Sequence, residues 1–429
     1  MPTFLRAALL LAVPFLATVA ASAHAATLRT FAFGPGDAPP GHTHVDADYT
    51  PARGYGFEPG ARPDGIHPFY FSVDLPEGNY TVTVTLGDDR AATTTTVKSE
   101  LRRLMLENVA TAPGQVVTRA FTVNVKTPRI PAGPGIAAGA VNLKAPRETV
   151  DEAWNWDGRL TLEINGAHPA VRTIAIAPAD VPTLYLLGDS TVCDQPAEPY
   201  NSWGQMLPRF FQPGIAVANH GESGETYRDS IARRRLDKVV SSLKPGDVVL
   251  MQFGHNDQKQ LRDGKGGPFT TYKDEIRTHV AAVRARGGLP VIVSSMERRA
   301  FDADGRVVPS LRDYAEAARQ SARELDAPFI DLNAMSRTLY EALGPEGSKA
   351  AFAEPAPGRL DNTHHDSYGS YELAKAVVLG LRQARVPIAR FVVDGFAFDP
   401  ARPDPVADFA VPPSPHRTEQ RPLGDEVRR

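Results

Sequence analysis

The fold is decided by residues 183–191, TLYLLGDST, where a short apolar run ends at Gly188 and a serine, Ser190, follows. Four further apolar runs come later in the chain, and segments with helical spacing of apolar residues separate them. The predicted strands are 183–187, 215–219, 247–253, 290–295 and 329–332, and the predicted helices are 231–243, 272–286, 314–325 and 367–382. This alternation predicts a three-layer α/β/α domain over 182–385, built on a five-stranded parallel sheet.

The residues before this domain, 26–178, have the pattern of antiparallel strands. β-branched residues recur with period two at 80–86, 121–125 and 160–164, and residues 28–33 form a shorter run of the same kind. Glycine and proline lie between the runs, and helical spacing is scarce. The pattern predicts a smaller β-sandwich in front of the α/β domain.

The start of the chain, residues 1–25, has the features of a secretory signal peptide. A basic residue, Arg6, precedes an apolar run, and the small-x-small sequence AHA follows at 23–25. The apolar run is shorter than the roughly 20 residues that a membrane span needs. The sequence therefore predicts a secreted or periplasmic protein that does not act at a membrane.

The proline-rich tail, 386–429, is predicted to be only partly ordered. Val392 and the segment 396–398 are apolar enough to pack on the rest of the chain. From Pro412 onward the tail has little to bury, which predicts disorder.

Composition limits the partners and cofactors. The net charge of −3 argues against nucleic acid or an anionic membrane as a partner. The single cysteine, Cys193, excludes an intramolecular disulfide and is predicted to be a buried packing residue. Histidine and cysteine do not occur at the spacing of a zinc site, so no metal is predicted. No organic cofactor is predicted either, because the serine and imidazole groups considered below need none.

Ser190 is a candidate nucleophile because it follows a predicted strand almost directly. Ligands of parallel α/β sheets bind beyond the carboxyl ends of the strands, and a nucleophilic serine needs exposure and nearby N–H donors. A turn capped by Asp189 or Ser190 explains the same residues without chemistry, so GDS alone is a weak signal. Asp189 itself is predicted to bond the loop around the serine.

A candidate base for that serine lies in the sequence DNTH at 361–364, just before a predicted helix. The carboxylate of Asp361 can reach one imidazole nitrogen of His364, which leaves the other nitrogen to face the serine. The same residues are also explained as the N-cap region of the helix 367–382. His365 is a rival base, although its side chain is expected to point elsewhere.

Two further loops offer hydrogen-bond donors at strand ends. In QFGHND, 252–257, the amide of Asn256 can donate to a developing oxyanion, an interaction worth about 3 kcal/mol. In NHGESG, 219–224, the N–H of Gly221 is a second candidate donor. Each loop alone is also explained as an ordinary turn. Their joint occurrence with Ser190 and the Asp–x–x–His pair is what acyl transfer requires.

This arrangement resembles the SGNH or GDSL-type hydrolases, whose four blocks carry Ser, Gly, Asn and His. The chain is most similar to the rhamnogalacturonan acetylesterase group of carbohydrate esterases, over about 182–383. The supporting strings are GDSTV at 188–192, NSWG at 201–204, NHGES at 219–223, GHNDQ at 254–258 and DNTH at 361–364. The β-sandwich resembles, more loosely, the galactose-binding-like modules that are joined to some of these esterases.

The resemblance implies a role for each matched residue. Ser190 would be the nucleophile, His364 the base and Asp361 the residue that orients the base. The N–H of Ser190, Gly221 and Asn256 would form the oxyanion hole.

Some positions depart from the family pattern or have no assigned role. Glu222 stands where relatives often carry arginine, and His365 stands where they often carry an aromatic residue. Trp203, Tyr227 and His255 are candidates for substrate binding, and Trp203 is equally well explained as a core residue.

The predicted function is removal of O-acetyl groups from a plant cell-wall polysaccharide, with acetylated rhamnogalacturonan or another pectin as the leading substrate. An acetylxylan esterase or a general GDSL esterase or lipase is the first alternative, although no apolar lid for a lipid substrate is evident. A polysaccharide-binding protein with an inactive hydrolase domain is the second, and the intact Ser, Asn, Asp and His argue against it.

Overall fold

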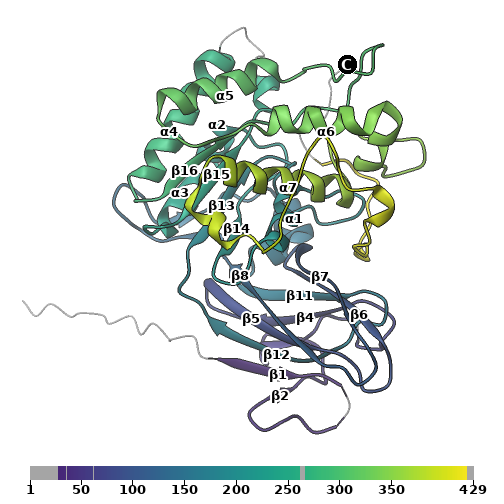
Figure 1. Cartoon of the computed structure of the whole chain (residues 1–429). Helices are drawn as coiled ribbons and strands as arrows, with labels where there is room; N and C mark the ends of the chain where they lie inside the picture. Colours follow the sequence, from purple (N-terminus) through teal and green to yellow (C-terminus); the bar gives the residue numbers. More distant parts are fainter. Residues whose placement is uncertain (1–27, 35, 61, 261–265, 423–429) are drawn as a thin grey trace, which may run out of the picture.

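The structure is a computed structural model that describes residues 28–34, 36–60, 62–260 and 266–422. An α/β domain packs on a β-sandwich, which lies below it in Figure 1. The predicted signal peptide, 1–25, lies outside the described residues. Within the part of the chain that is described, no helix is both long and apolar enough to span a bilayer.

A five-stranded parallel sheet forms the centre of the α/β domain, as predicted. The strands are β13 (Thr183–Gly188), β14 (Ala216–Asn219), β15 (Val248–Gln252), β16 (Leu289–Val293) and β17 (Phe329–Ile330). Their spatial order is β14-β13-β15-β16-β17, and every neighbouring pair is parallel. Each strand coincides with one predicted apolar run, because a strand that is covered on both faces keeps apolar residues at consecutive positions.

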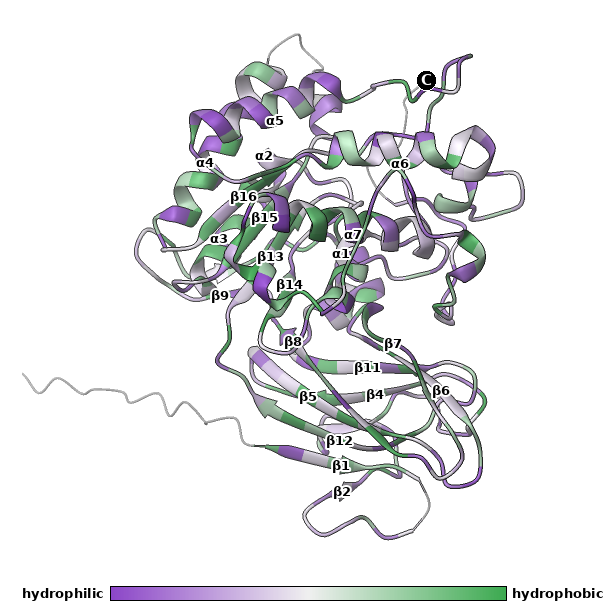
Figure 2. Cartoon of the chain, in the orientation of Figure 1, coloured by the Kyte–Doolittle hydropathy of each residue, from purple (hydrophilic) through white to green (hydrophobic). Residues whose placement is uncertain are grey.

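Helices cover both faces of this sheet and so give the three predicted layers (Figure 1). They are α1 (Trp203–Met206), α2 (Tyr227–Ala232), α3 (Arg235–Ser242), α4 (Lys273–Arg284), α5 (Arg312–Glu324), α6 (Leu332–Gly347) and α7 (Ser367–Gln383). Leu184 and Leu186 of β13 share a core with α1, α6 and α7, whereas Tyr185 and Leu187 share one with α3, α4 and α5. Figure 2 shows the resulting pattern, with hydrophobic strands inside and helices of mixed polarity, such as α4 and α5, outside.

Some helices differ from the prediction. The predicted helix 231–243 covers the last residues of α2 and the whole of α3, which are separate helices because Arg234 takes a left-handed conformation between them (φ 63°). The short α1 and the long α6 were not predicted. Only Asp331 separates β17 from α6, so the predicted strand 329–332 includes the first residue of this helix. Asp331 caps α6 by accepting a hydrogen bond from the N–H of Ala334 at 3.2 Å.

The β-sandwich consists of two five-stranded sheets around one hydrophobic core. Its strands are β1 (Arg29–Ala32), β2 (Thr43–His44), β3 (Tyr55–Phe57), β4 (Phe69–Asp74), β5 (Gly78–Leu86), β6 (Thr93–Ser99), β7 (Arg103–Thr111), β8 (Val117–Val125), β11 (Arg159–Asn165) and β12 (Val171–Pro178). The sheet orders are β2-β1-β12-β5-β8 and β3-β4-β11-β6-β7. In β5 the alternate residues Val82, Val84 and Leu86 are fully buried, as the period-two pattern predicted. The resemblance of this domain to galactose-binding-like modules stays a prediction.

Between β8 and β11 the chain leaves the sandwich and runs against the α/β domain. This segment, 126–158, is called the excursion below, and it contains the short pair β9 (Arg129–Ile130) and β10 (Gly139–Ala140). Ile130, Val141 and Trp156 of the excursion join the core beneath α3 and α4. The excursion therefore brings residues of the first half of the chain next to the loops that follow the parallel strands.

Two arginines before and at the start of β7 also enter the α/β domain. Arg103 Nε lies 2.7 Å from Asp194 Oδ2, and Arg102 Nη2 lies 2.5 Å from Glu198 Oε1. All four side chains are at most 6% exposed. Because a buried charge without its partner is costly, these pairs fix the loop 194–198 against the sandwich.

The first part of the tail packs on the α/β domain, as predicted. A short 3-10 turn, Pro387–Phe391, leads into Val392, which is 4% exposed. Phe396 and Phe398 lie against the same core.

The prediction of disorder from Pro412 onward is wrong for the described part of the tail. Ser414 is 3% exposed. Its hydroxyl donates to Glu163 at 2.7 Å and accepts from Lys98 Nζ at 2.8 Å, and its N–H donates to Glu198 Oε1 at 3.0 Å. The tail lacks apolar side chains to bury, but buried polar groups of the sandwich and of loop 194–198 supply hydrogen bonds in their place.

Gly380→Ala is expected to destabilise the protein by about 1–3 kcal/mol, because α7 packs on β17 through this glycine. A Cβ at this position would lie 2.4 Å from Ile330 Cγ2 and 3.2 Å from Ile330 Cβ. Gly347→Ala is the control, since its Cβ would meet nothing closer than 4.0 Å, and it should gain up to about 1 kcal/mol from helix propensity. Urea denaturation followed by circular dichroism measures both, and a neutral Gly380→Ala would contradict this packing.

Candidate active site

Ser190 follows the carboxyl end of β13 in a tight turn. The turn comes close to two neighbours at Gly188, where a Cβ would lie 2.4 Å from Val192 Cγ2 and 2.7 Å from the carbonyl oxygen of Gln252. Only glycine fits this approach. The strand can therefore end there and leave Ser190 at the edge of the sheet, where 3% of its surface is exposed.

Asp189 bonds the loop around the serine. Its carboxylate accepts hydrogen bonds from the N–H and the hydroxyl of Thr191, at 3.0 and 2.7 Å, and lies 3.2 Å from His255 Nδ1. Burial raises the pKa of Asp189, but the charge and hydrogen bond of His255 and the bonds from Thr191 outweigh it, so the pKa lies below its usual value. These contacts agree with the structural role that the sequence suggested.

The structure brings Ser190, His364 and Asp361 together. His364 Nε2 lies 2.8 Å from Ser190 Oγ, and His364 Nδ1 lies 3.0 Å from Asp361 Oδ2. The other carboxylate oxygen accepts the N–H groups of Thr363 and His364, at 2.8 and 3.0 Å. Burial raises the pKa of Asp361, but the hydrogen bond and charge of His364 and these N–H donors lower it to about 2. An ionised, fixed carboxylate holds the imidazole with its far nitrogen toward the serine, which is the geometry of a general base.

His365, the rival candidate for the base, points away from Ser190, as the sequence analysis predicted. Its Nε2 lies 2.7 Å from the hydroxyl oxygen of Tyr340, and its ring lies 4.4 Å from that of Phe352. Burial, together with the charge of His364, lowers the pKa of His365 to about 3. The second histidine is therefore a neutral packing residue.

The three predicted oxyanion donors differ in their availability. The N–H of Ser190 has no acceptor among the described residues. Asn256 uses one hydrogen of its amide, which donates to the carbonyl of Glu225 at 3.1 Å, and its second amide hydrogen is left for a ligand. The N–H of Gly221 already donates to Asn219 Oδ1 at 3.0 Å. The prediction for Gly221 is thus not met in this conformation, because the loop satisfies that donor itself.

The predicted substrate-binding residues need correction. Trp203 is 1% exposed and donates from Nε1 to Gln252 Oε1 at 2.8 Å, so it is a core residue and not a sugar platform. Tyr227 is fully buried beside Phe253 and is also a core residue. His255 is 2% exposed, and its Nε2 has no hydrogen-bond partner among the described residues. Only His255 keeps a polar atom that a ligand could still engage.

The sequence analysis missed two residues that border the triad. Gln195 Nε2 donates to the carbonyl of Ser190 at 2.7 Å. The ring of Tyr200 meets the ring of His364 edge-on, at 5.8 Å and 87°. Both lie in a proline-containing loop without periodicity, and Arg102 fixes this loop by donating to the carbonyls of Gln195 and Tyr200, at 3.1 and 2.8 Å. Nothing local in the sequence indicates that partner, which lies in the other domain.

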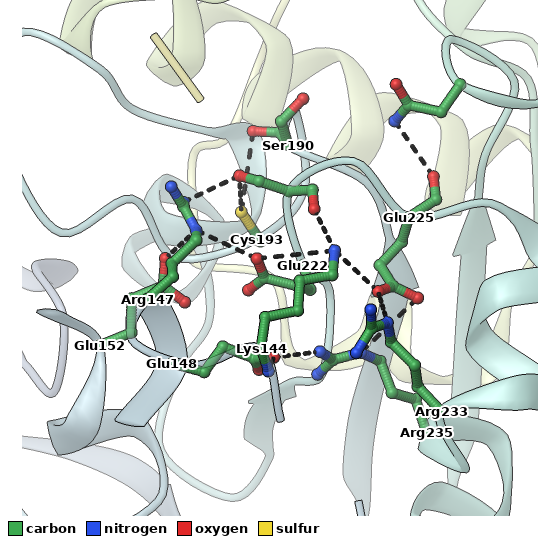
Figure 3. Close-up of polar contacts among 12 residues, drawn as sticks. Lys144, Arg147, Glu148, Glu152, Ser190, Cys193, Glu222, Glu225, Arg233 and Arg235 are labelled. Atoms are coloured by element: carbon green, nitrogen blue, oxygen red, sulfur yellow. Dashed lines mark hydrogen bonds and ion pairs between the residues drawn. The ribbon is translucent and has the colours of Figure 1, made fainter. Parts of the chain in front are cut away.

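A cluster of buried glutamates lies beside the loop that carries Ser190 (Figure 3). We call it the glutamate cluster; its members are Glu148, Glu152, Glu222 and Glu225 with Lys144, Arg147, Arg233 and Arg235. Arg147 Nε lies 2.6 Å from Glu152 Oε1 and 3.0 Å from Glu222 Oε1. Burial and the charge of Glu222 raise the pKa of Glu152 well above its usual value. Glu222, the departure from the family pattern, is thus matched by an arginine that the excursion supplies.

Three carboxylates of the same cluster lie close enough together to hold a metal ion. Oxygen atoms of Glu148, Glu152 and Glu222 lie within 4.8 Å of one another, and carboxylates are ligands that Ca²⁺ and Mg²⁺ prefer. However, Arg147 bridges Glu152 and Glu222, and Arg235 Nη2 lies 2.6 Å from Glu148. Guanidinium groups already neutralise these oxygens, so the cluster is an ion-pair network.

Cys193 lies in the same region and is buried, as predicted. Its Sγ is 3.4 Å from the hydroxyl oxygen of Ser223. Burial, followed by the charges of Glu222 and Glu152, raises the pKa of the thiol well above its usual value. The thiolate needed for nucleophilic chemistry is therefore disfavoured.

Comparison with known proteins places these residues inside a matched region. The model of the GDSL-like Lipase/Acylhydrolase family matches residues 186–364, a range that contains Ser190, Gly221, Asn256 and both members of the Asp–x–x–His pair. The rhamnogalacturonan acetylesterase RhgT of Bacillus subtilis is 38% identical over 220 residues, which are 49% of this chain and 94% of that protein.

Two further similarities extend beyond the α/β domain. The uncharacterized esterase YxiM of B. subtilis is 26% identical over 383 residues, which cover 82% of this chain and 90% of that protein. A crystal structure of the B. subtilis YxiM protein aligns with 84% of this chain and 99% of its own, at 24% identity and a TM-score of 0.47.

Asp361→Asn is expected to change the acid stability of the protein. The folded pKa of about 2 lies below the roughly 3.9 of an unfolded chain, so the ionised carboxylate stabilises the fold above about pH 4 and this contribution is lost as the pH falls toward 2. The variant should be less stable than wild type by about 2 kcal/mol at neutral pH, and the difference should shrink in acid. Urea denaturation across this range measures it, with Asp313→Asn on the exposed side of α5 as the control. A difference that does not depend on pH would contradict the pairing.

Cys193 should resist alkylation in the folded protein. Because the thiol is buried and its pKa is raised, reaction with iodoacetamide at mildly alkaline pH should be at least about a hundredfold slower than in the unfolded chain. Mass spectrometry over time measures the rate, and the same reaction in urea is the control. Equal rates in the two conditions would show that the thiol is accessible.

Proposed function

Because this chain belongs to the GDSL-like lipase/acylhydrolase family and is an esterase, we propose that it removes O-acetyl groups from a plant cell-wall polysaccharide. The leading substrate is acetylated rhamnogalacturonan, since the relative with 38% identity is named a rhamnogalacturonan acetylesterase. The observation that carries the proposal is the chain of contacts from Asp361 through His364 to Ser190, at 3.0 and 2.8 Å. Such a chain activates a serine hydroxyl for attack on an ester.

The proposed reaction proceeds in two halves. Ser190 Oγ attacks the acetyl carbonyl while His364 Nε2 takes the hydroxyl proton. The tetrahedral intermediate collapses, the C–O bond to the sugar breaks, and the protonated imidazole gives its proton to the departing sugar oxygen. Water then attacks the acetyl-serine with His364 again as base, and acetate and free Ser190 are released.

The negative charge that develops on the carbonyl oxygen needs donors that are not already used. The N–H of Ser190 and the second amide hydrogen of Asn256 meet this requirement. Gly221 joins them only if its N–H leaves Asn219 when substrate binds. Each donor of this kind is worth about 3 kcal/mol in the transition state.

Two further elements complete the proposal. Action outside the cytoplasm rests on the predicted signal peptide, 1–25. An inactive domain that only binds polysaccharide is disfavoured, because an unused serine would have no reason to keep an aligned imidazole backed by an ionised carboxylate.

Ser190→Ala and His364→Ala should each lower kcat for acetate release by at least about a thousandfold, since the members of a triad act as a unit. The substrates are acetylated rhamnogalacturonan, acetylated homogalacturonan and acetylxylan. Ser241→Ala on α3 is the matched control and should keep wild-type rates. Preference for acetylxylan would keep the mechanism and reject the pectic substrate. Full activity of Ser190→Ala would reject the mechanism.

A further inference from the structure

A cleft of about 850 Å³ opens beside the proposed triad. Its walls come from parts of the chain that are far apart in the sequence: Leu101 of the sandwich, the excursion at 144–154, the loop 195–200 and the tail at 416–422. Only the loop belongs to the predicted α/β domain. A ligand in this cleft would therefore meet groups that a bare α/β domain does not have.

Two residues that line the cleft contact the triad. The ring of Tyr200, in one wall, lies 5.8 Å from the ring of His364. Arg421, in the tail wall, places Nε 3.5 Å from Asp361 Oδ2. A polysaccharide that lies along the cleft would thus extend from the site where its ester is cleaved.

The tail wall is held in place by backbone hydrogen bonds. The N–H of Glu198 donates to the carbonyl of His416 at 2.8 Å, and the N–H of Thr418 donates to the carbonyl of Glu198 at 2.7 Å. Together with the buried Ser414, these bonds hold the residues on either side of Arg417. Arg417 therefore starts from a fixed backbone, which limits the entropy lost when it binds a ligand.

The cleft has an excess of positive charge, although the chain carries a net charge of −3. Its lining contains the cations Lys144, Arg147, Arg417 and Arg421 but a single carboxylate, Asp151. Lys144 and Arg147 are already paired within the glutamate cluster. Arg417 is an exposed residue and forms no ion pair within the described ranges, so it is the cation most available to a ligand.

An aromatic ring completes the lining. Trp154 of the excursion lines the cleft and is half-buried. Tyr70 of the sandwich supports it at a ring distance of 5.2 Å. A supported indole ring offers an apolar face for the faces of sugar rings, with little entropy to lose.

We propose that this cleft binds the sugar chain next to the ester through an anionic sugar, with Arg417 on its carboxylate and Trp154 against a ring. The assignment rests on the proposed function and deepens it, because it places charge selection in the tail and ring stacking in the excursion. Arg421 also faces the cleft, but its contact with Asp361 means that its replacement would disturb the triad as well. Arg417 is therefore the residue to test.

Steady-state kinetics on matched substrates tests the assignment. The substrates are acetylated rhamnogalacturonan oligosaccharides, the same oligosaccharides with their uronate carboxyls reduced to alcohols, and 4-nitrophenyl acetate. Wild type should prefer the charged over the reduced oligosaccharide by about tenfold in kcat/KM, and added salt should weaken this preference. Arg417→Gln should lose the preference, whereas Arg323→Gln, an exposed arginine of α5, should keep it.

Trp154→Ala tests the aromatic contact separately. It should lower kcat/KM for both oligosaccharides about tenfold relative to that for 4-nitrophenyl acetate, because stacking does not depend on the carboxylate. If the ratio of kcat/KM for the oligosaccharides to that for 4-nitrophenyl acetate equals the wild-type ratio, Trp154 does not contact the sugar. Thermal midpoints of all variants identify any loss of folding.

The remaining outcomes separate this assignment from the proposed function. If Arg417→Gln keeps the full preference, or wild type has none, the anionic site is wrong and the esterase stands. If wild type cleaves 4-nitrophenyl acetate but neither oligosaccharide, the proposed polysaccharide is wrong. Calorimetric titration of Ser190→Ala with a deacetylated galacturonate oligosaccharide then decides the assignment: binding that Arg417→Gln abolishes supports it, and absence of binding overturns it.

Discussion

The buried ion pairs of Arg102 and Arg103 with the loop 194–198 are the constraint on which the rest of the site depends. That loop carries Gln195, which holds the carbonyl of the serine, and leads to Tyr200, which borders the histidine. Both arginines belong to the sandwich. Breaking a buried pair of this kind by removing one partner costs about 3–5 kcal/mol, so the sandwich is a structural part of the site and not a detachable module.

The glutamate cluster also links the two parts of the chain, because glutamates of one part pair with cations of the other. Glu222 and Glu225 follow β14, whereas Lys144, Arg147 and Glu148 come from the excursion. Glu222 is almost fully buried beside the loop of Ser190, and burying its charge without a cationic partner would strongly destabilise the fold. With Arg147 and Lys144 in place, ion pairs hold the loop that carries Gly221.

The sequence predicted those parts of the molecule whose physical cause is local. Strands buried on both faces are mostly apolar at consecutive positions, so all five strands of the parallel sheet could be located. Because their carboxyl ends share one edge, Ser190 and Asn256 were expected near each other and near the Asp–x–x–His pair. Burial by remote partners could not be predicted: Trp203 was equally compatible with a cleft and a core, and Tyr227, a candidate cleft residue, is buried in the core. The described tail from Pro412 onward departs from the prediction of disorder, because its partners are polar groups of the sandwich and of loop 194–198, whereas the composition of a segment indicates only how much apolar surface it can bury.

The tail also has a consequence for the order of synthesis. Ser414 binds Glu163, a residue that leaves the ribosome 251 positions earlier, and domains of a growing chain fold in order from the amino end. The strands of the sandwich are therefore synthesised long before Ser414. Until Ser414 is made, Lys98 and Glu163 lack its hydrogen bonds and are exposed to water at this position. The parallel sheet and its Asp–x–x–His pair are also complete before Ser414 emerges. The substrate selection proposed for Arg417 would thus be the last property that the nascent protein acquires, after the groups proposed to cleave the ester.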